Sequence, residues 1–105
     1  MRATRKSSKK PPFAMLEHQV LDSPAFARLS FPAKTLLLLL VRQYNGANNG
    51  RLHCSFAWLR KYGYGSEHTT ARGLSDLIAA GFVWQTRRHG AGVAARFMLT
   101  WLPVN

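Results

Sequence analysis

Hydrogen-bonding and cationic side chains gather on one side of a segment with helical periodicity, residues 66–80. Its apolar residues recur at the spacing of a single helical stripe, and they are Ala71, Leu74, Leu77 and Ile78. His68, Thr69, Arg72 and Asp76 fall roughly opposite this stripe. The candidate binding residues of the segment are Ser66, His68, Thr69, Thr70 and Arg72. The planar guanidinium of Arg72 matches two acceptors on a guanine edge, while the hydroxyls of Ser66 and Thr70 suit phosphate. A solvated helix face without a ligand is the alternative interpretation.

Two acids lie in the same segment, where they would repel phosphates. Glu67 stands near the start of the predicted helix, and a carboxylate there complements the positive end of the helix dipole. Asp76 lies four residues after Arg72, which is a spacing at which helical side chains meet. We expect Asp76 to pair with Arg72 in the free protein.

A second cationic cluster surrounds a bend that contains Gly90 and Gly92. Its members are Arg87, Arg88, His89 and Arg96. Because arginine favours narrow minor grooves, a mobile hairpin tip with these side chains suits a duplex backbone or a minor groove. A hairpin whose charges serve only solubility is the alternative.

Further cations lie outside these two clusters. Residues 1–12 hold no acid and two prolines, so they are predicted to form a disordered basic arm that tracks phosphates. The cations of this arm are Arg2, Arg5, Lys6, Lys9 and Lys10. Arg60 and Lys61 end a predicted short helix, where cations suit the dipole and could also reach phosphates. An arm that only solubilises the chain is an equally open interpretation.

The charge of the whole chain is strongly one-sided. Its 105 residues contain 15 Lys and Arg against 4 Asp and Glu, which gives a formal charge of +11. This balance points to a polyanionic partner, most often nucleic acid. A basic protein of a ribosome or membrane surface is the less specific alternative. The single cysteine, Cys54, excludes an internal disulfide and fits a reducing, cytoplasmic compartment. A DNA-binding protein in that compartment is expected to associate with the bacterial nucleoid.

Signals for enzyme and metal chemistry are weak. None of the four acids forms a spaced acid–base pair, and no nucleophile motif is present. The histidines are too scattered for a zinc signature; they are His18, His53, His68 and His89. We therefore expect no enzyme, no metal and no cofactor. The leucine run 36–40 is too short to span a bilayer, and no signal peptide is evident, so no membrane partner is expected.

The first half of the chain is predicted to supply a helical core. Ser23-Pro24 begins a short helix that buries Phe26 and Leu29. Ser30 caps a longer helix that runs to about Tyr44 and is apolar on almost every side, so it is the expected central helix. Asparagines and glycines then end it, and residues 52–54 are predicted to form a short strand that pairs with the hairpin.

The second half is predicted to position the candidate residues. A short helix over 55–62 buries Phe56 and Leu59, with Trp58 either at the core rim or exposed. Gly63 and Gly65 allow a steep turn into the helix 66–80, which Ser66 caps. Strands over 82–87 and 95–101 follow, and the second alternates apolar and polar residues.

From residue 13 to residue 101, the order of these features resembles the winged helix-turn-helix DNA-binding proteins of bacterial mobile elements, in particular the N-terminal domain of plasmid and phage replication initiators. The matching pieces are Leu29-Ser30, Ala33-Lys34 before the leucine-rich helix, the Asn/Gly linker, Ser66 with Thr69 and Thr70, Leu74 with Leu77, and the stretches 80–83, 87–92 and 97–100. The resemblance implies an α+β domain over 13–105 with three to four helices and a C-terminal β-hairpin wing. It also implies binding of duplex DNA through the helix 66–80 and the wing.

The combined expectation is a non-enzymatic protein that binds double-stranded DNA and regulates transcription or replication in a phage, plasmid or other mobile element. The chain ends soon after the last strand, so a regulator or accessory protein without a further C-terminal domain fits better than an initiator. A monomer and a homodimer are both compatible with the sequence. Two alternatives stay open: an RNA-binding module, and a protein-interaction domain that inhibits a host nucleic-acid enzyme. The second alternative is favoured if Trp58, Tyr62, Tyr64 and Trp84 form one exposed patch.

Overall fold

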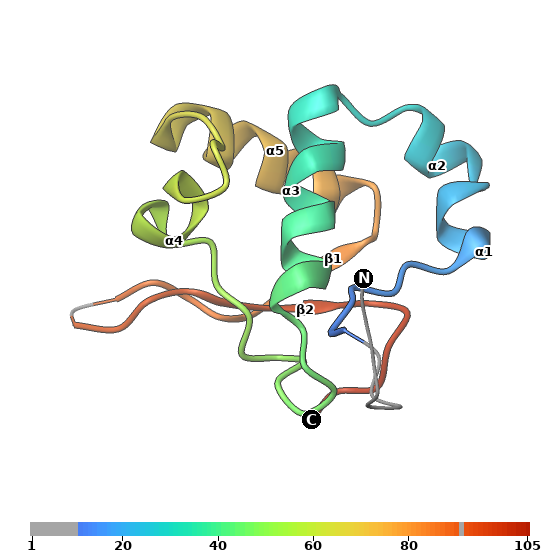
Figure 1. The fold of residues 1–105 in the computed structure, drawn as a ribbon. Coiled ribbons are helices and arrows are strands. Elements are labelled where there is room, and N and C mark those ends of the chain that lie inside the picture. The colour runs from blue at the N-terminus through green and yellow to red at the C-terminus, as the bar shows by residue number, and fades with distance from the viewer. Residues whose placement is uncertain (1–10, 91) are drawn as a thin grey trace.

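A computed structural model describes residues 11–90 and 92–105 as an α+β domain of five helices and a two-stranded antiparallel hairpin. The elements in chain order are α1 (His18–Leu21), α2 (Pro24–Ala27), α3 (Phe31–Gln43), α4 (Phe56–Arg60), α5 (Glu67–Ala79), β1 (Val83–Arg87) and β2 (Arg96–Leu99). Figure 1 shows α3 at the centre of the helices, with the hairpin passing beneath them. The predicted arm, residues 1–12, lies outside the described part of the chain except for Pro11 and Pro12.

Serine side chains define where four of these helices begin. The hydroxyl oxygens of Ser23, Ser30, Ser55 and Ser66 each accept a hydrogen bond from the backbone N–H three residues later. Such bonds satisfy amide donors that have no partner inside the helix. The caps predicted at Ser23, Ser30 and Ser66 are confirmed, and Pro24 and Pro32 occupy the first helical turns, where the missing N–H costs nothing.

The core is built around α3. Six of its thirteen residues are buried, namely Ala33, Leu36, Leu37, Leu39, Leu40 and Val41. Residues from α4, α5 and the hairpin complete the core, chiefly Leu59, Leu77, Val83, Phe97 and Leu99. The predicted central helix is therefore confirmed: it begins directly after its cap Ser30 and ends at Gln43, one residue before the expected end. No helix of the described residues is both long and apolar enough to cross a membrane.

The hairpin pairs β1 with β2 in antiparallel register, from Val83 opposite Leu99 to Arg87 opposite Arg96, with an irregularity between Gln85 and Arg87. On β2, Phe97 and Leu99 are buried whereas Arg96 and Met98 are only half-buried, as the alternation predicted. Leu52 forms an isolated antiparallel bridge with Phe97. Residues 52–54 therefore pair with the hairpin as expected, but through one bridge rather than a strand.

A buried side chain ties the loop after α3 to the end of the chain. The Asn49 amide nitrogen donates to the carbonyl oxygens of Leu99, Leu102 and Pro103, at 3.0, 3.2 and 3.0 Å. Its amide oxygen accepts from the Leu99 N–H at 2.7 Å. At the other end, Trp101 donates from its indole N–H to the Glu17 carboxylate at 3.1 Å, which joins the segment before α1 to the segment after β2.

Several expectations about burial are wrong. Phe56 is 37% exposed because it is the first residue of α4, and Leu59 alone on that helix is buried. On α5 the buried residues are Thr70, Gly73 and Leu77, whereas Ala71 and Ile78 are exposed. The face of α5 that packs on α3 is therefore rotated from the predicted stripe, and glycine and threonine supply part of it. Phe26 is only half-buried, although Leu29 is buried as expected.

Candidate nucleic-acid interface

The first turn of α5 holds together through three of the predicted site residues. The Ser66 hydroxyl oxygen accepts from the Thr69 N–H at 3.2 Å and lies 3.2 Å from the Thr69 hydroxyl. Thr70 is buried, and its hydroxyl donates to the Ser66 carbonyl oxygen at 3.0 Å. The Thr70 hydroxyl is therefore not exposed for the expected phosphate contact, because it is hydrogen-bonded within the helix.

His68 and Arg72 are the predicted α5 residues whose side chains are exposed. They lie four residues apart, so they share one face of the helix. Asp76 accepts a hydrogen bond at 3.0 Å from the hydroxyl of Ser30, the residue that caps α3. The structure thus gives Asp76 a partner on another helix in place of the expected Arg72.

The approach of α5 to α3 is set by Gly73 and Tyr64. Tyr64 lies in the turn between α4 and α5, and its hydroxyl donates to the Pro32 carbonyl oxygen at 2.8 Å. A Cβ at position 73 would lie 2.8 Å from that hydroxyl oxygen, so only glycine fits there without a shift. Gly63, with a φ of +74°, makes the turn that brings Tyr64 inward.

Burial of Tyr64 also bears on the protein-interaction alternative. Its side chain is 8% exposed, so it does not share a surface patch with the other aromatic residues. Burial, with smaller contributions from the Cys54 and Asp76 charges, raises the pKa of its phenol. Trp58 and Tyr62 do contact one another, with ring centroids 4.9 Å apart, whereas Trp84 lies on β1. The four-residue aromatic patch that would favour this alternative is therefore not formed.

The cations that end α4 are exposed beside aromatic rings. The Arg60 guanidinium lies 5.5 Å from the Phe56 ring centroid, and the Lys61 ammonium lies 5.7 Å from the Tyr62 ring centroid. Contacts of this kind orient a long side chain without removing its charge. Arg60 and Lys61 therefore remain available to a phosphate.

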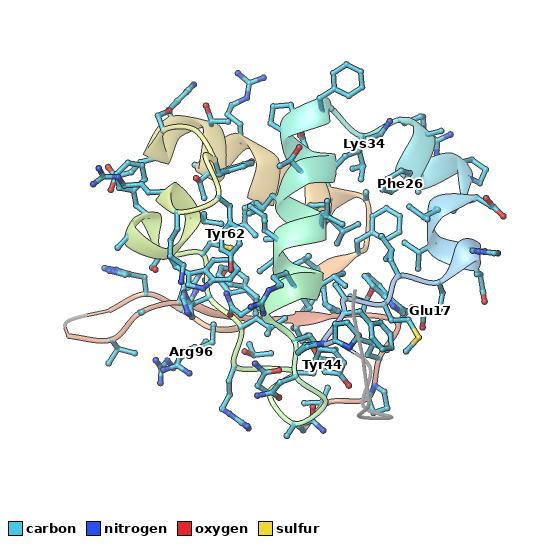
Figure 2. The ribbon with its side chains drawn as sticks, viewed as in Figure 1. Glu17, Phe26, Lys34, Tyr44, Tyr62 and Arg96 are labelled. Atoms are coloured by element: carbon cyan, nitrogen blue, oxygen red, sulfur yellow. The ribbon has the colours of Figure 1, made fainter. Side chains whose placement is uncertain are left out.

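The hairpin uses its four predicted cationic residues differently. Arg87 donates from Nε and Nη2 to the Ala94 carbonyl oxygen, at 3.1 and 3.0 Å, so part of its guanidinium ties the end of β1 to the segment before β2. Arg88 and His89 are exposed beyond the strand. Arg96 on β2 is half-buried, and its Nε has no hydrogen-bond partner among the described residues. Figure 2 labels Arg96 on the hairpin, with Tyr62, from the turn after α4, above it.

A groove of about 500 Å³ lies between the first half of α5 and the hairpin. Its lining comes from both elements and from the segment before α4: His53, Cys54, Ser55, Phe56, Glu67, Thr70, Ala71, Leu74, His89, Ala94, Ala95, Arg96 and Phe97. The groove places α5 and the hairpin tip on one side of the molecule. Of the predicted binding residues, Thr70 on α5 and His89 and Arg96 on the hairpin line the groove, whereas His68, Arg72, Arg87 and Arg88 do not. The arm residues Arg2, Arg5, Lys6, Lys9 and Lys10 lie outside the described part.

Burial shifts the pKa values of two side chains in the groove, His53 and Cys54. Burial, and then the nearby Arg96 charge, lowers the pKa of His53 from its ordinary 6.5. Burial raises the pKa of the Cys54 thiol to about 12, so a thiolate is not formed near neutral pH. In the described part of the chain, no group of three or more His, Cys, Asp or Glu residues is placed to hold a metal ion.

Sequence reasoning missed Gly73, Tyr64 and Ala71 as residues that shape this region. A glycine in the interior of an otherwise regular helix was a readable signal, because it costs stability unless a close approach requires it. No local signal could show that Tyr64 turns inward, since its position depends on Pro32, thirty-two residues earlier.

No protein-family model, curated protein or solved structure matches this chain significantly. Inference about its function therefore depends on its own residues and their arrangement.

Proposed function

We propose that this protein is a winged helix-turn-helix protein that binds double-stranded DNA without catalysis, with α5 in the major groove and the hairpin as the wing. The observation that carries the proposal is the groove lined by both α5 and the hairpin, which supports an interface to which both elements contribute. The order of the elements, with two helices joined by a tight turn and followed by a hairpin, is compatible with that fold.

The dimensions and the exposed side chains of α5 suit the major groove. Thirteen residues make a helix of roughly 20 Å, and a major groove about 12 Å wide admits such a helix. Recognition helices read base edges with residues of their N-terminal half, where His68 and Arg72 are exposed. We assign base recognition to these two residues. Ser66 and Thr69 form the polar start of the helix and are assigned a position near phosphate.

The wing and the arm supply attraction that does not depend on sequence. Arg88 and His89 extend from the hairpin, while Arg60 and Lys61 lie at the end of α4. Ten of the fifteen Lys and Arg residues and all four acids fall within residues 11–105, so this part keeps an excess of six positive charges without the arm. Such a surface neutralises phosphates and releases their counterions.

The biological role follows from the resemblance to winged domains of bacterial mobile elements rather than from geometry. We propose a regulator of transcription or replication in a phage, plasmid or related element that acts at the bacterial nucleoid. Such a role requires DNA binding and needs no catalytic residues, and the sequence shows no catalytic motif. Its oligomeric state decides whether its site is a single or a paired half-site.

The experiment is a titration of the purified protein with a fluorescent random-sequence 20-base-pair duplex between 50 and 200 mM salt. If roughly six phosphates are neutralised, log affinity falls against log salt with a slope of about −5, which is about a 1000-fold loss over this range. An affinity that does not change with salt would contradict the proposal. A matched RNA duplex serves as competitor: its narrow major groove excludes a helix, so RNA that displaces DNA efficiently would favour the RNA-binding alternative.

Matched variants assign the contacts. Arg88→Gln in the wing and Arg28→Gln on the segment after α2 remove the same charge. Arg28 lines a separate hollow with Asp76, Ala79 and Ala80, at the C-terminal end of α5, away from the proposed interface. We expect Arg88→Gln to reduce the magnitude of the salt slope by about one and Arg28→Gln to leave it nearly unchanged. Equal effects would show that only net charge matters.

A further inference from the structure

We propose that the groove between α5 and the hairpin is a binding site for a small organic carboxylate with an apolar body. The groove has a volume of about 500 Å³, which is within the usual range for small-molecule sites. Its walls combine small apolar side chains with one guanidinium that lacks part of its hydrogen bonding. The proposed base contacts His68 and Arg72 do not line it, whereas His89 of the proposed wing lies in its lining.

The apolar part of the ligand is inferred from the walls. Ala71 and Leu74 come from α5, and Ala95 and Phe97 come from the hairpin side. Ala71 is exposed and Leu74 is only half-buried, so apolar surface of α5 is left uncovered across from the hairpin. A compact hydrocarbon or aromatic body would remove this surface from water.

The acidic part of the ligand is inferred from Arg96. Its Nε is buried yet has no hydrogen-bond partner among the described residues, and such a group is costly to leave unpaired. A carboxylate accepts two parallel hydrogen bonds from a guanidinium, which a neutral amide cannot do. Because Arg96 lines the groove, the proposal requires its side chain to turn so that Nε–H and one Nη–H face the carboxylate.

The other polar residues of the groove fit an acceptor ligand. His53 Nδ1 accepts from the Ser55 N–H at 3.3 Å, so its neutral form carries the proton on Nε2 and remains a donor. His89 adds a second imidazole at the rim. Glu67 is the one acid of the lining, and its charge is offset because it lies in the first turn of α5.

The test is an NMR titration of the full ¹⁵N-labelled chain without DNA, with 3-phenylpropanoate as the probe and 3-phenylpropanamide as its neutral counterpart. We expect the carboxylate to bind with a dissociation constant of about 1 mM or lower, and to shift the amide signals of Ala71, Leu74, Arg96 and Phe97. The amide should bind about tenfold more weakly, because it lacks the charge-assisted pair. Equal binding of the two probes, shifts elsewhere, or no shifts up to about 10 mM would overturn the proposal.

Two variants and one further probe sharpen the result. Arg96→Gln should abolish the preference for the carboxylate, whereas Arg88→Gln, on the same hairpin but outside the groove, should keep it. Ala71→Phe places a large side chain at an exposed position of the groove wall and should prevent both probes from binding. This variant tests the site independently if the Arg96→Gln protein does not fold. Inorganic phosphate is the last probe. If phosphate shifts the same amide signals as strongly, the groove binds DNA phosphates and the proposal of an organic carboxylate is wrong.

Discussion

The hydroxyl of Tyr64 occupies the space that a side chain at position 73 would need. An added Cβ on Gly73 would lie 2.8 Å from the Tyr64 oxygen, which donates to the Pro32 carbonyl oxygen at 2.8 Å. The turn before α5, the middle of α5 and the start of α3 are thus fixed by one contact. Because α5 carries the proposed recognition residues, this contact sets how far they stand from the core.

The first prediction is a coupling between these two positions. Glycine inside a helix ordinarily costs about 1 kcal/mol relative to alanine, so Gly73→Ala should stabilise the protein if space allows. We expect no gain in the native background, since the Tyr64 hydroxyl blocks the methyl group. In a Tyr64→Phe background the gain should return, which gives a coupling of about 1 kcal/mol. Urea unfolding of the four proteins in this cycle measures it, and additive effects would show that the contact does not limit position 73.

A second prediction concerns Asn49, whose buried amide serves the segment after β2. Asn49→Ala should lower the free energy of unfolding by about 2–3 kcal/mol, because the N–H and the carbonyl oxygen of Leu99 lose a buried hydrogen-bond partner. Asn45→Ala is the matched control. It removes one exposed bond to the Ala47 N–H and should cost less than about 1 kcal/mol. Similar losses in the two variants would refute a special role for Asn49.

Acid should weaken the fold through His53. Its folded pKa is below the ordinary 6.5, because burial and the Arg96 charge disfavour the imidazolium. The unfolded chain therefore binds the proton more readily, so the stabilisation is present above about pH 6.5 and is lost as the pH falls through the folded pKa. NMR titration of the His53 ring should show this lowered pKa. In Arg96→Gln it should rise only partway toward 6.5, because burial is the larger cause. A full return to 6.5 would mean that charge, not burial, dominates.

Sequence reasoning predicted much of this fold because its signals were local. Serines at positions 23, 30 and 66 begin helices where expected, and the leucine-rich segment forms the central helix. The exposed face of α5 was less predictable. Apolar spacing suggested that Ala71 and Ile78 face the core, yet Gly73 and Thr70 take that face because they allow α5 to lie close to α3. Small residues select such an approach without raising hydrophobicity, so a hydrophobic stripe does not reveal it.

The sequence predicted which charged residues belong to the candidate site, but it did not predict which partners their side chains contact. Cations mark the hairpin in the sequence, but only the fold shows that Arg87 bonds to the segment before β2 while Arg88 is exposed. Likewise, the sequence suggests Arg72 as the partner of Asp76, whereas a contact with Ser30 depends on how α3 and α5 pack. Long-range partners of this kind have no periodic signature.

Arg72 should carry sequence discrimination more than affinity. Removing a guanidinium that contacts a base edge costs about 1–3 kcal/mol at the preferred sequence and much less elsewhere. Arg72→Ala should therefore narrow the ratio between a preferred and a scrambled duplex by roughly tenfold or more, while Arg28→Ala keeps the ratio. Fluorescence anisotropy with both duplexes gives the two ratios. A uniform loss on both sequences would reassign Arg72 to the phosphate backbone.

The arm should act without sequence preference. Deletion of residues 1–10 removes five cations, which should weaken binding to every duplex by a similar factor and reduce the magnitude of the salt slope. The same anisotropy assay measures this factor on both duplexes. If only the preferred sequence loses affinity, the arm reads bases, as a minor-groove arm does.

Selection from random duplex DNA at near-physiological salt tests the central claim most directly. The purified protein is mixed with a random library, and the bound DNA is recovered, amplified and sequenced over several rounds. Sequence-specific binding through α5 predicts an enriched motif, with one half-site for a monomer or two related half-sites about 10 base pairs apart for a homodimer. The Arg72→Ala protein should lose that motif while still retaining DNA. Failure to retain any duplex DNA would contradict the proposed function. Retention of DNA without an enriched motif would show that the protein binds phosphate backbones and does not read sequence.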